Sequence, residues 1–118
     1  MEAKDLMKIA VKCADDKKAL DLKVLNITEL TTLADYFVIC HGSSTPQMNA
    51  IFDEIDEKLK EQNIYMYNAG SRDSNQWMLM DYGDVIVHIF NTESREFYGI
   101  ENLWADAESV DISEYITE

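Results

Sequence analysis

The sequence predicts a single α/β domain in which helices pack on a mixed β-sheet. Three observations lead to this prediction. Helical and strand-like patterns alternate along the chain. The 118 residues suffice for one hydrophobic core but not for two. Apolar residues make up 47% of the chain although its formal net charge is −13, so it is expected to fold rather than remain a disordered acidic polymer.

The first half of the chain contains two predicted helices and two predicted strands. In residues 1–18, apolar residues recur at spacings of three and four, which is typical of an amphipathic helix. Residues 22–26 and 36–41 are predicted strands, and the second is an apolar run that indicates a buried position. A second amphipathic helix is predicted over 46–62, because hydroxyl residues that can cap a helix precede its initial proline.

The second half adds strands and short helical segments. Strand-like runs occupy 64–67, 76–82 and 85–90, and the polar residues 68–75 are a predicted loop. A short helix at 93–98 and a helical turn at 101–107 follow. We expect the folded domain to cover residues 1–107. The remaining residues, 108–118, are rich in acids and are expected to form a solvated, frayed tail.

Gly83-Asp84 is a two-residue pair of the kind that closes a tight hairpin. A two-residue turn pairs Asp81 with Ile86 and Trp77 with Phe90, whereas a longer turn would change these pairs. One face of the hairpin is then almost wholly apolar and is expected to pack against helices: Met78, Met80, Tyr82, Val85, Val87 and Ile89. The other face mixes polar and apolar side chains and is expected nearer solvent or a partner: Trp77, Leu79, Asp81, Ile86, His88 and Phe90.

The negative charge is concentrated in the second half of the chain. Residues 1–60 hold 8 basic and 11 acidic side chains, and residues 61–118 hold 2 basic and 12 acidic ones. The two halves therefore carry −3 and −10. Nucleic acid or an anionic membrane is not expected as the main partner, since phosphate binding needs clustered Lys and Arg. A basic protein is the natural complement.

Nothing in the sequence indicates a secreted or membrane-spanning chain. Cys13 and Cys40 each lie in an apolar run and are expected in the core. No secretory signal and no apolar run of membrane-spanning length is evident. The expected location is the cytoplasm.

Two short patterns allow a functional and a purely structural interpretation. Gly42-Ser43-Ser44 lies between a strand and a helix, where it could bind a phosphate or simply cap the helix. It is similar to the Gly-Ser turn of nucleotidyltransferases, which also need metal-binding carboxylates; Asp81 and Asp84 are the candidates. His41 and His88 have no second ligand at metal spacing. The sequence therefore predicts no metal site, no cofactor and no catalytic residue.

A longer pattern resembles one protein family closely. The run from Trp77 to Phe90, followed by Arg95-Glu96-Phe97-Tyr98 and then Glu101 to Trp104, is similar to the signature of the ribosomal silencing factor family, also called Iojap or RsfS. Upstream, residues 34–39 and the Gly42-Ser43-Ser44 junction are similar as well. The resemblance covers about residues 5–107. Cys40-His41 departs from the small residues that the family commonly has there.

The resemblance implies a fold and a function. Members are α/β domains with a mixed sheet, distantly similar to nucleotidyltransferases but not enzymes. They bind the large ribosomal subunit through a small basic protein at the subunit-joining face, block the small subunit and repress translation when nutrients are scarce. Many are homodimers in isolation. Two alternatives remain open: a nucleotidyltransferase-like enzyme using Ser43 with Asp81 and Asp84, and a dimeric adaptor for another basic protein.

The resemblance also implies a partner-binding set. Its expected members are Trp77, Asp81, His88, Tyr98, Glu101, Leu103 and Trp104, with Met78, Tyr82, Asp84 and Phe97 as supports. Asp81 and Glu101 would pair with Lys or Arg of the partner, and the aromatic residues and Leu103 would supply apolar anchors. Whether each large aromatic fills the core or meets a partner is left open.

Overall fold

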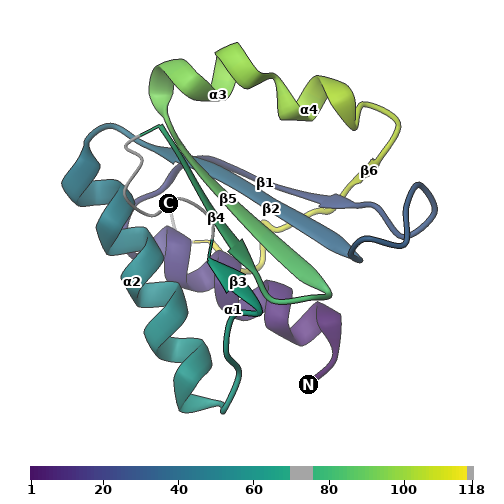
Figure 1. Ribbon diagram of the computed structural model, residues 1–118, viewed down its shortest axis with the longest axis horizontal. Helices are drawn as coiled ribbons and strands as arrows, with labels where there is room; N and C mark the ends of the chain where they lie inside the picture. The colour runs from purple at the N-terminus through teal and green to yellow at the C-terminus, as the bar shows by residue number, and fades with distance from the viewer. Residues whose placement is uncertain (70–75, 117–118) are drawn as a thin grey trace.

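The computed structural model describes residues 1–69 and 76–116, in which one sheet separates two layers of helices (Figure 1). The elements are α1 (Ala3–Asp16), β1 (Leu20–Asn26), β2 (Tyr36–Gly42), α2 (Thr45–Glu61), β3 (Asn68–Ala69), β4 (Trp77–Asp81), β5 (Val85–Asn91), α3 (Thr92–Tyr98), α4 (Ile100–Leu103) and β6 (Glu108–Ser109). None of the helices in these ranges is long and apolar enough to cross a membrane. The predicted α/β class is confirmed.

The sheet is mixed, with the strand order β3-β4-β5-β2-β1-β6. The central pair, β2 and β5, is parallel, and the other neighbouring strands are antiparallel. Both central strands are almost entirely buried, since helices cover both faces of the sheet. This buried position explains why the sequence of each central strand is a continuous apolar run.

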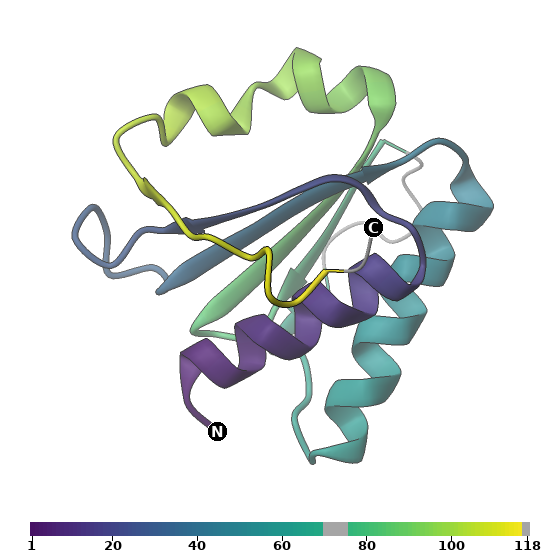
Figure 2. The ribbon, with the colours of Figure 1, turned by 180° about the vertical axis from the view of Figure 1, so that it is seen from behind.

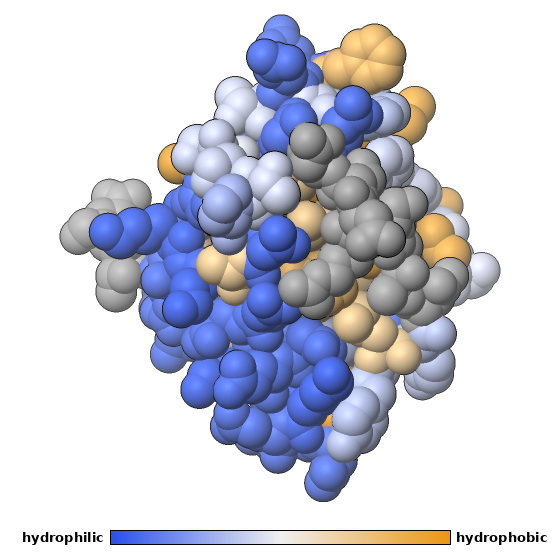
Figure 3. Space-filling view, turned by 60° about the vertical axis from the view of Figure 1, so that its left-hand side comes forward, coloured by the Kyte–Doolittle hydropathy of each residue, from blue (hydrophilic) through white to orange (hydrophobic). Residues whose placement is uncertain are grey.

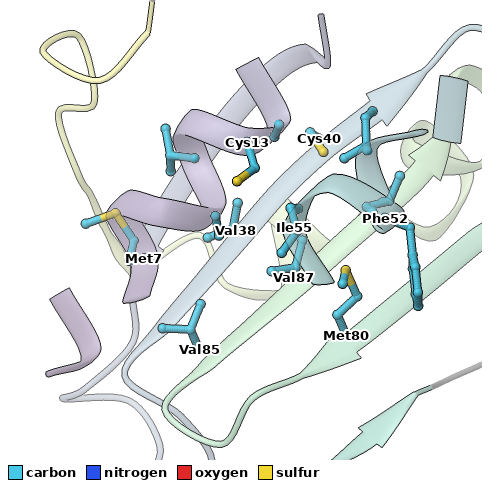
Figure 4. Close-up of a cluster of buried hydrophobic side chains, with 14 of the residues drawn as sticks. Met7, Cys13, Val38, Cys40, Phe52, Ile55, Met80, Val85 and Val87 are labelled. Atoms are coloured by element: carbon cyan, nitrogen blue, oxygen red, sulfur yellow. The ribbon is translucent and has the colours of Figure 1, made fainter. Parts of the chain in front are cut away.

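The larger core lies between the sheet and the helices α1 and α2. Figure 4 shows side chains of β2, β4 and β5, among them Val38, Met80 and Val87, directed toward this helical layer. The apolar face of the hairpin belongs to this core, as predicted. Cys13 and Cys40 are buried, unpaired thiols within it, also as predicted, and burial raises the pKa of Cys40 to about 12.

The hairpin has the predicted register. Trp77 pairs with Phe90 and Asp81 with Ile86. The Tyr82 N–H donates to the Val85 carbonyl at 3.0 Å, which closes the turn. Gly83 has a φ of +85°, which explains a glycine at this position.

The second hairpin face is not open to solvent, which corrects our expectation. The segment α3–α4 crosses the opposite side of the sheet from α1 and α2 (Figures 1 and 2). It covers a second, smaller core that contains Ile86, Phe90 and Ile100. His88 is buried with them, whereas Trp77 and Leu79 are only half-buried. The second core is small and leaves part of this face half-buried, which explains why polar and apolar side chains are mixed on it.

The strand predicted at 64–67 is wrong, because pairing begins later. The turn after α2 passes through Asn63, whose φ is +62°, before the chain reaches the sheet. The Tyr67 N–H donates to the Asp81 carbonyl at 2.8 Å, and β3 follows at residues 68–69. The first two residues of the predicted loop are thus a strand, and 70–75 lie outside the described residues.

Residues 108–116 are not a frayed tail. β6 pairs with β1, and the Val110 N–H donates to the Val24 carbonyl at 2.9 Å. Figure 2 shows the segment continuing onto the face of the sheet that α1 covers, where Ile112 is 8% exposed within the larger core. Apolar side chains interspersed with the acids make this packing possible. The core therefore extends beyond residue 107, the domain limit that we predicted.

Candidate partner-binding surface

The Gly42-Ser43-Ser44 junction is a capped helix start. Ser44 Oγ accepts from the Gln47 N–H at 3.2 Å. Gln47 folds back, so that its Oε1 accepts from the Ser43 N–H at 2.7 Å while its Nε2 donates to the Lys18 carbonyl at 2.7 Å. Two of the amides that could bind a phosphate, those of Ser43 and Gln47, are thus already bonded within the chain. The geometry favours the structural interpretation.

The carboxylates of the enzyme alternative lie far from this junction. β2 and β5 run parallel, with Tyr36 beside Val85 at one end and Gly42 beside Asn91 at the other. Asp84 and Ser43 therefore lie at opposite ends of this strand pair, about 26 Å apart along the strand direction. Asp81 accepts the Gly83 N–H at 2.8 Å as part of the hairpin turn. Within residues 1–69 and 76–116, no group of three or more His, Cys, Asp or Glu could hold a metal ion.

Local sequence signals place α3 and α4 across the sheet. Asn91 caps α3, and its Oδ1 accepts from the Ser94 N–H at 2.7 Å. Gly99, with a φ of +56°, ends α3 and allows the chain to enter α4 at once. The break lets the segment follow the sheet while its outer side remains in solvent.

Arg95 attaches this segment to the sheet. Its side chain is 7% exposed, and its Nε donates to Glu101 at 2.6 Å. Its Nη1 lies 3.3 Å from the Leu20 carbonyl and 2.9 Å from His41 Nδ1. Burial and the neighbouring Arg95 charge lower the pKa of His41, so a neutral ring can accept this hydrogen bond.

Sequence reasoning missed this role for Arg95 and His41. Arg95 is one of only two Lys or Arg residues in the second half of the chain, which holds 12 acids. This isolation was the sequence feature that could have indicated an ion pair within the fold. Glu101, expected to meet a basic partner, is instead paired with Arg95 and with Lys23 at 3.4 Å. It is only half-buried, so part of it remains accessible.

The outer side of α3–α4 exposes large apolar side chains. Phe97 is 82% exposed, Leu103 78% and Tyr98 39%. We call these three residues the α3–α4 surface. Exposed acids flank them in the sequence: Glu93, Glu96 and Asp106. In Figure 3 the lower part of the view is largely hydrophilic; at the top, the end at which α3 runs, an apolar group lies beside hydrophilic ones, and further apolar atoms lie along the right-hand side.

An aromatic series connects this surface to the sheet. The rings of Phe97 and Tyr98 are 5.2 Å apart, and those of Tyr98 and Trp77 are 4.9 Å apart. Trp77 in turn lies 5.8 Å from the His88 ring. The half-buried Trp104 packs on Phe37 at 5.2 Å, beneath the same segment. The structure therefore brings together most of the predicted aromatic anchors.

Other predicted residues lie elsewhere. Met78 and Tyr82 are buried on the α1–α2 side of the sheet, and the Tyr82 hydroxyl donates to Asp56 at 3.3 Å. They belong to the core and present nothing to a partner on the α3–α4 surface. Asp81 is half-buried and Asp84 exposed at the hairpin end. His88 is 3% exposed, so it does not itself face a partner.

Comparison with known proteins agrees with this fold. A family model described as "ribosomal silencing factor during starvation", RsfS, matches residues 1–118. Ribosomal silencing factor RsfS of Bacillus subtilis is 40% identical over 112 residues, which cover 95% of each chain. A crystal structure of a Chromobacterium violaceum protein superimposes with a TM-score of 0.86 at 32% identity, covering 89% of this chain and 88% of that one.

A more distant relative comes from mouse. It is named mitochondrial assembly of ribosomal large subunit protein 1, and it is 29% identical over 91 residues, 75% of this chain and 40% of its own length. The family model and the bacterial relative are both described as ribosomal silencing factors. Full-length agreement in sequence and in fold leads to one conclusion: this chain belongs to the ribosomal silencing factor (RsfS) family.

Proposed function

We propose that this chain represses translation by binding the large ribosomal subunit and occluding the small one. It binds through a basic ribosomal protein at the subunit-joining face. The single observation that carries the proposal is the α3–α4 surface, where Phe97 and Leu103 are more than three-quarters exposed on a strongly acidic half of the chain. Large apolar side chains left in solvent and rimmed by charge are typical of protein–protein interfaces. The name of the mouse relative supports the large subunit as the target.

The chemistry of the partner follows from that surface. Lys or Arg side chains of the partner would meet Glu93, Glu96, Asp106 and the accessible part of Glu101. Phe97, Tyr98 and Leu103 would enter apolar recesses, with Trp77 and Trp104 behind them. Asp81 and Asp84 lie at the hairpin end and would contribute only to a wider footprint. A typical interface removes about 800 Å² from each partner, a modest part of the chain's 6731 Å².

Occlusion needs a rigid body in the right place and no reaction. The chain measures about 34 × 33 × 31 Å. An object of that size on the joining face keeps the small subunit from its contacts by excluded volume. We place this event in the cytoplasm, where the subunits meet.

Sedimentation of ribosomal subunits tests the proposal. Dissociated subunits are returned to joining conditions with and without a stoichiometric amount of the protein. We expect the protein to sediment with the large subunit and the joined peak to shrink. Normal joining despite saturating protein would refute occlusion, and the absence of protein from the large-subunit fraction would refute binding.

The homodimer implied by the family resemblance remains part of the proposal. Sedimentation equilibrium of the free chain measures its mass against the 13.6 kDa protomer. A mass of one protomer at all concentrations would refute it.

A further inference from the structure

His88 is a buried polar side chain whose surroundings are almost wholly apolar. It lies on the central strand β5, is 3% exposed, and has Phe37 and Phe90 as ring neighbours. Its Nδ1 lies 3.1 Å from the Trp77 indole nitrogen. The indole N–H can only donate, so Nδ1 is the acceptor and the ring proton of a neutral His88 lies on Nε2.

This arrangement is a poor way to fill a core. Nε2 is buried, and no described residue pairs with it. A buried donor without a partner costs free energy that an aliphatic side chain of similar volume would not. Burial also lowers the pKa of His88 to about 4, so the ring stays neutral and able to accept at neutral pH. Among the described residues, the one polar contact that His88 makes is the hydrogen bond to Trp77.

The position of Trp77 explains why the hydrogen bond to His88 matters. Trp77 lies in β4, next to the edge strand, and is only half-buried: its ring lies 5.1 Å from that of Phe90 in the smaller core, and part of it stays open to solvent. Its ring packs on Tyr98, which is part of the α3–α4 surface. The orientation of the indole therefore determines which face and edge support Tyr98 and meet a docking partner.

We propose that His88 is a positioning residue: by accepting the indole N–H, it holds Trp77 in the orientation that the partner-binding surface requires. This inference rests on the proposed function, since the surface in question is the one that binds the large subunit. His88 does not touch the partner. Its effect on binding is transmitted through Trp77 alone.

A double-mutant cycle tests this transmission. His88→Leu removes the acceptor but keeps apolar volume, and Trp77→Phe keeps a ring but removes the N–H donor. We expect His88→Leu to weaken large-subunit binding about tenfold when Trp77 is present, and less than about twofold in the Trp77→Phe background. His88→Asn places an amide oxygen close to the former Nδ1 position and is expected to restore most of the affinity.

Two measurements on the free protein separate positioning from folding. His88→Leu is expected to leave the melting temperature unchanged or raise it, because the unpaired donor is gone. In ¹H–¹⁵N spectra, the Trp77 indole signal, identified by its loss in Trp77→Phe, should shift and exchange faster with solvent in His88→Leu. His88→Asn should return it toward the original position.

The outcomes distinguish this inference from the proposed function. If the unmodified chain does not bind large subunits, both are overturned. If it binds, equal losses of affinity in the two Trp77 backgrounds would overturn the positioning role alone. An unchanged indole signal in a folded His88→Leu protein would do the same.

Discussion

Truncating the exposed apolar anchors of the α3–α4 surface should separate binding from stability. Phe97→Ala and Leu103→Ala remove side chains that are 82% and 78% exposed in the free chain. Because little of either side chain is buried, we expect each change to alter the free energy of unfolding by no more than about 0.5 kcal/mol. Thermal unfolding measures this directly.

The effect on binding should be much larger. A buried aromatic side chain removes about 150–250 Å² from water, and most of the Phe97 surface is available for burial on docking. The exposed 82% of the smaller figure is about 120 Å², which at about 25 cal/mol per Å² corresponds to about 3 kcal/mol, or a loss of affinity of about 100-fold or more. Leu103→Ala removes less area and should cost about 1–2 kcal/mol.

The assay is the affinity of each variant for purified large subunits at one fixed salt concentration. Tyr65→Ala is a matched control, because Tyr65 is a 59% exposed aromatic between α2 and β3, and its neighbours Ile64 and Met66 pack against the core on the α1–α2 side of the sheet. It should bind like the unmodified chain. Unchanged affinity in folded Phe97→Ala and Leu103→Ala proteins would refute the assignment of this surface.

Three further predictions concern stability. Ile112→Ala should lower the free energy of unfolding by about 2–4 kcal/mol in urea titration, because Ile112 is buried in the larger core; a change below about 0.5 kcal/mol would mean that the C-terminal segment does not pack there. Stability should also fall in mild acid: the pKa of His88 is about 4 when folded and 6.5 in the unfolded chain, so the unfolded state gains a proton first as the pH drops. The difference between the two pKa values lowers the free energy of unfolding by about 3 kcal/mol as the pH falls from 6.5 to 4, and a pH series on His88→Leu, which lacks this titration, should show a shallower slope. Gly83→Ala should cost about 1–2 kcal/mol by thermal unfolding, because its φ is +85° and the new Cβ would lie 2.5 Å from the Tyr67 ring; an unchanged melting temperature would contradict the hairpin geometry.

Most local features were predictable because they depend on neighbouring residues. The register of the hairpin follows from a two-residue turn and from the period of two along each strand, and both are visible between Trp77 and Phe90. The start of α2 follows from Ser44 and Pro46 in the same way. These signals act over a few residues, so no knowledge of the remaining fold is needed to read them.

The errors arose where distant segments compete for the same surface. The acidic C-terminal segment looked solvated, yet β1 offers it a free edge and the α1 side offers Ile112 an apolar site. The strand expected at 64–67 begins later, since pairing with Asp81 depends on how far α2 carries the chain from the sheet. His88 was expected at the partner-binding surface because of the family resemblance and the mixed composition of its strand face, but α3–α4 packs over that face and His88 is buried.

By itself, the sequence determined most of the helices and strands, the hairpin register, the burial of its apolar face and the family of this protein; the strand at 64–67 and the frayed tail were wrong. Only the tertiary structure decided which aromatics are core and which are surface. The aromatic series contains three large aromatic residues with different exposure: Trp77, Phe90 and Phe97. The segment α3–α4 covers Phe90 and half-covers Trp77, whereas Phe97, which belongs to α3 itself, is exposed. Burial depends on what packs over a residue. The position of short helices such as α3 and α4, linked by Gly99, is determined by the sheet on which they pack, and the sequence pattern does not contain that information.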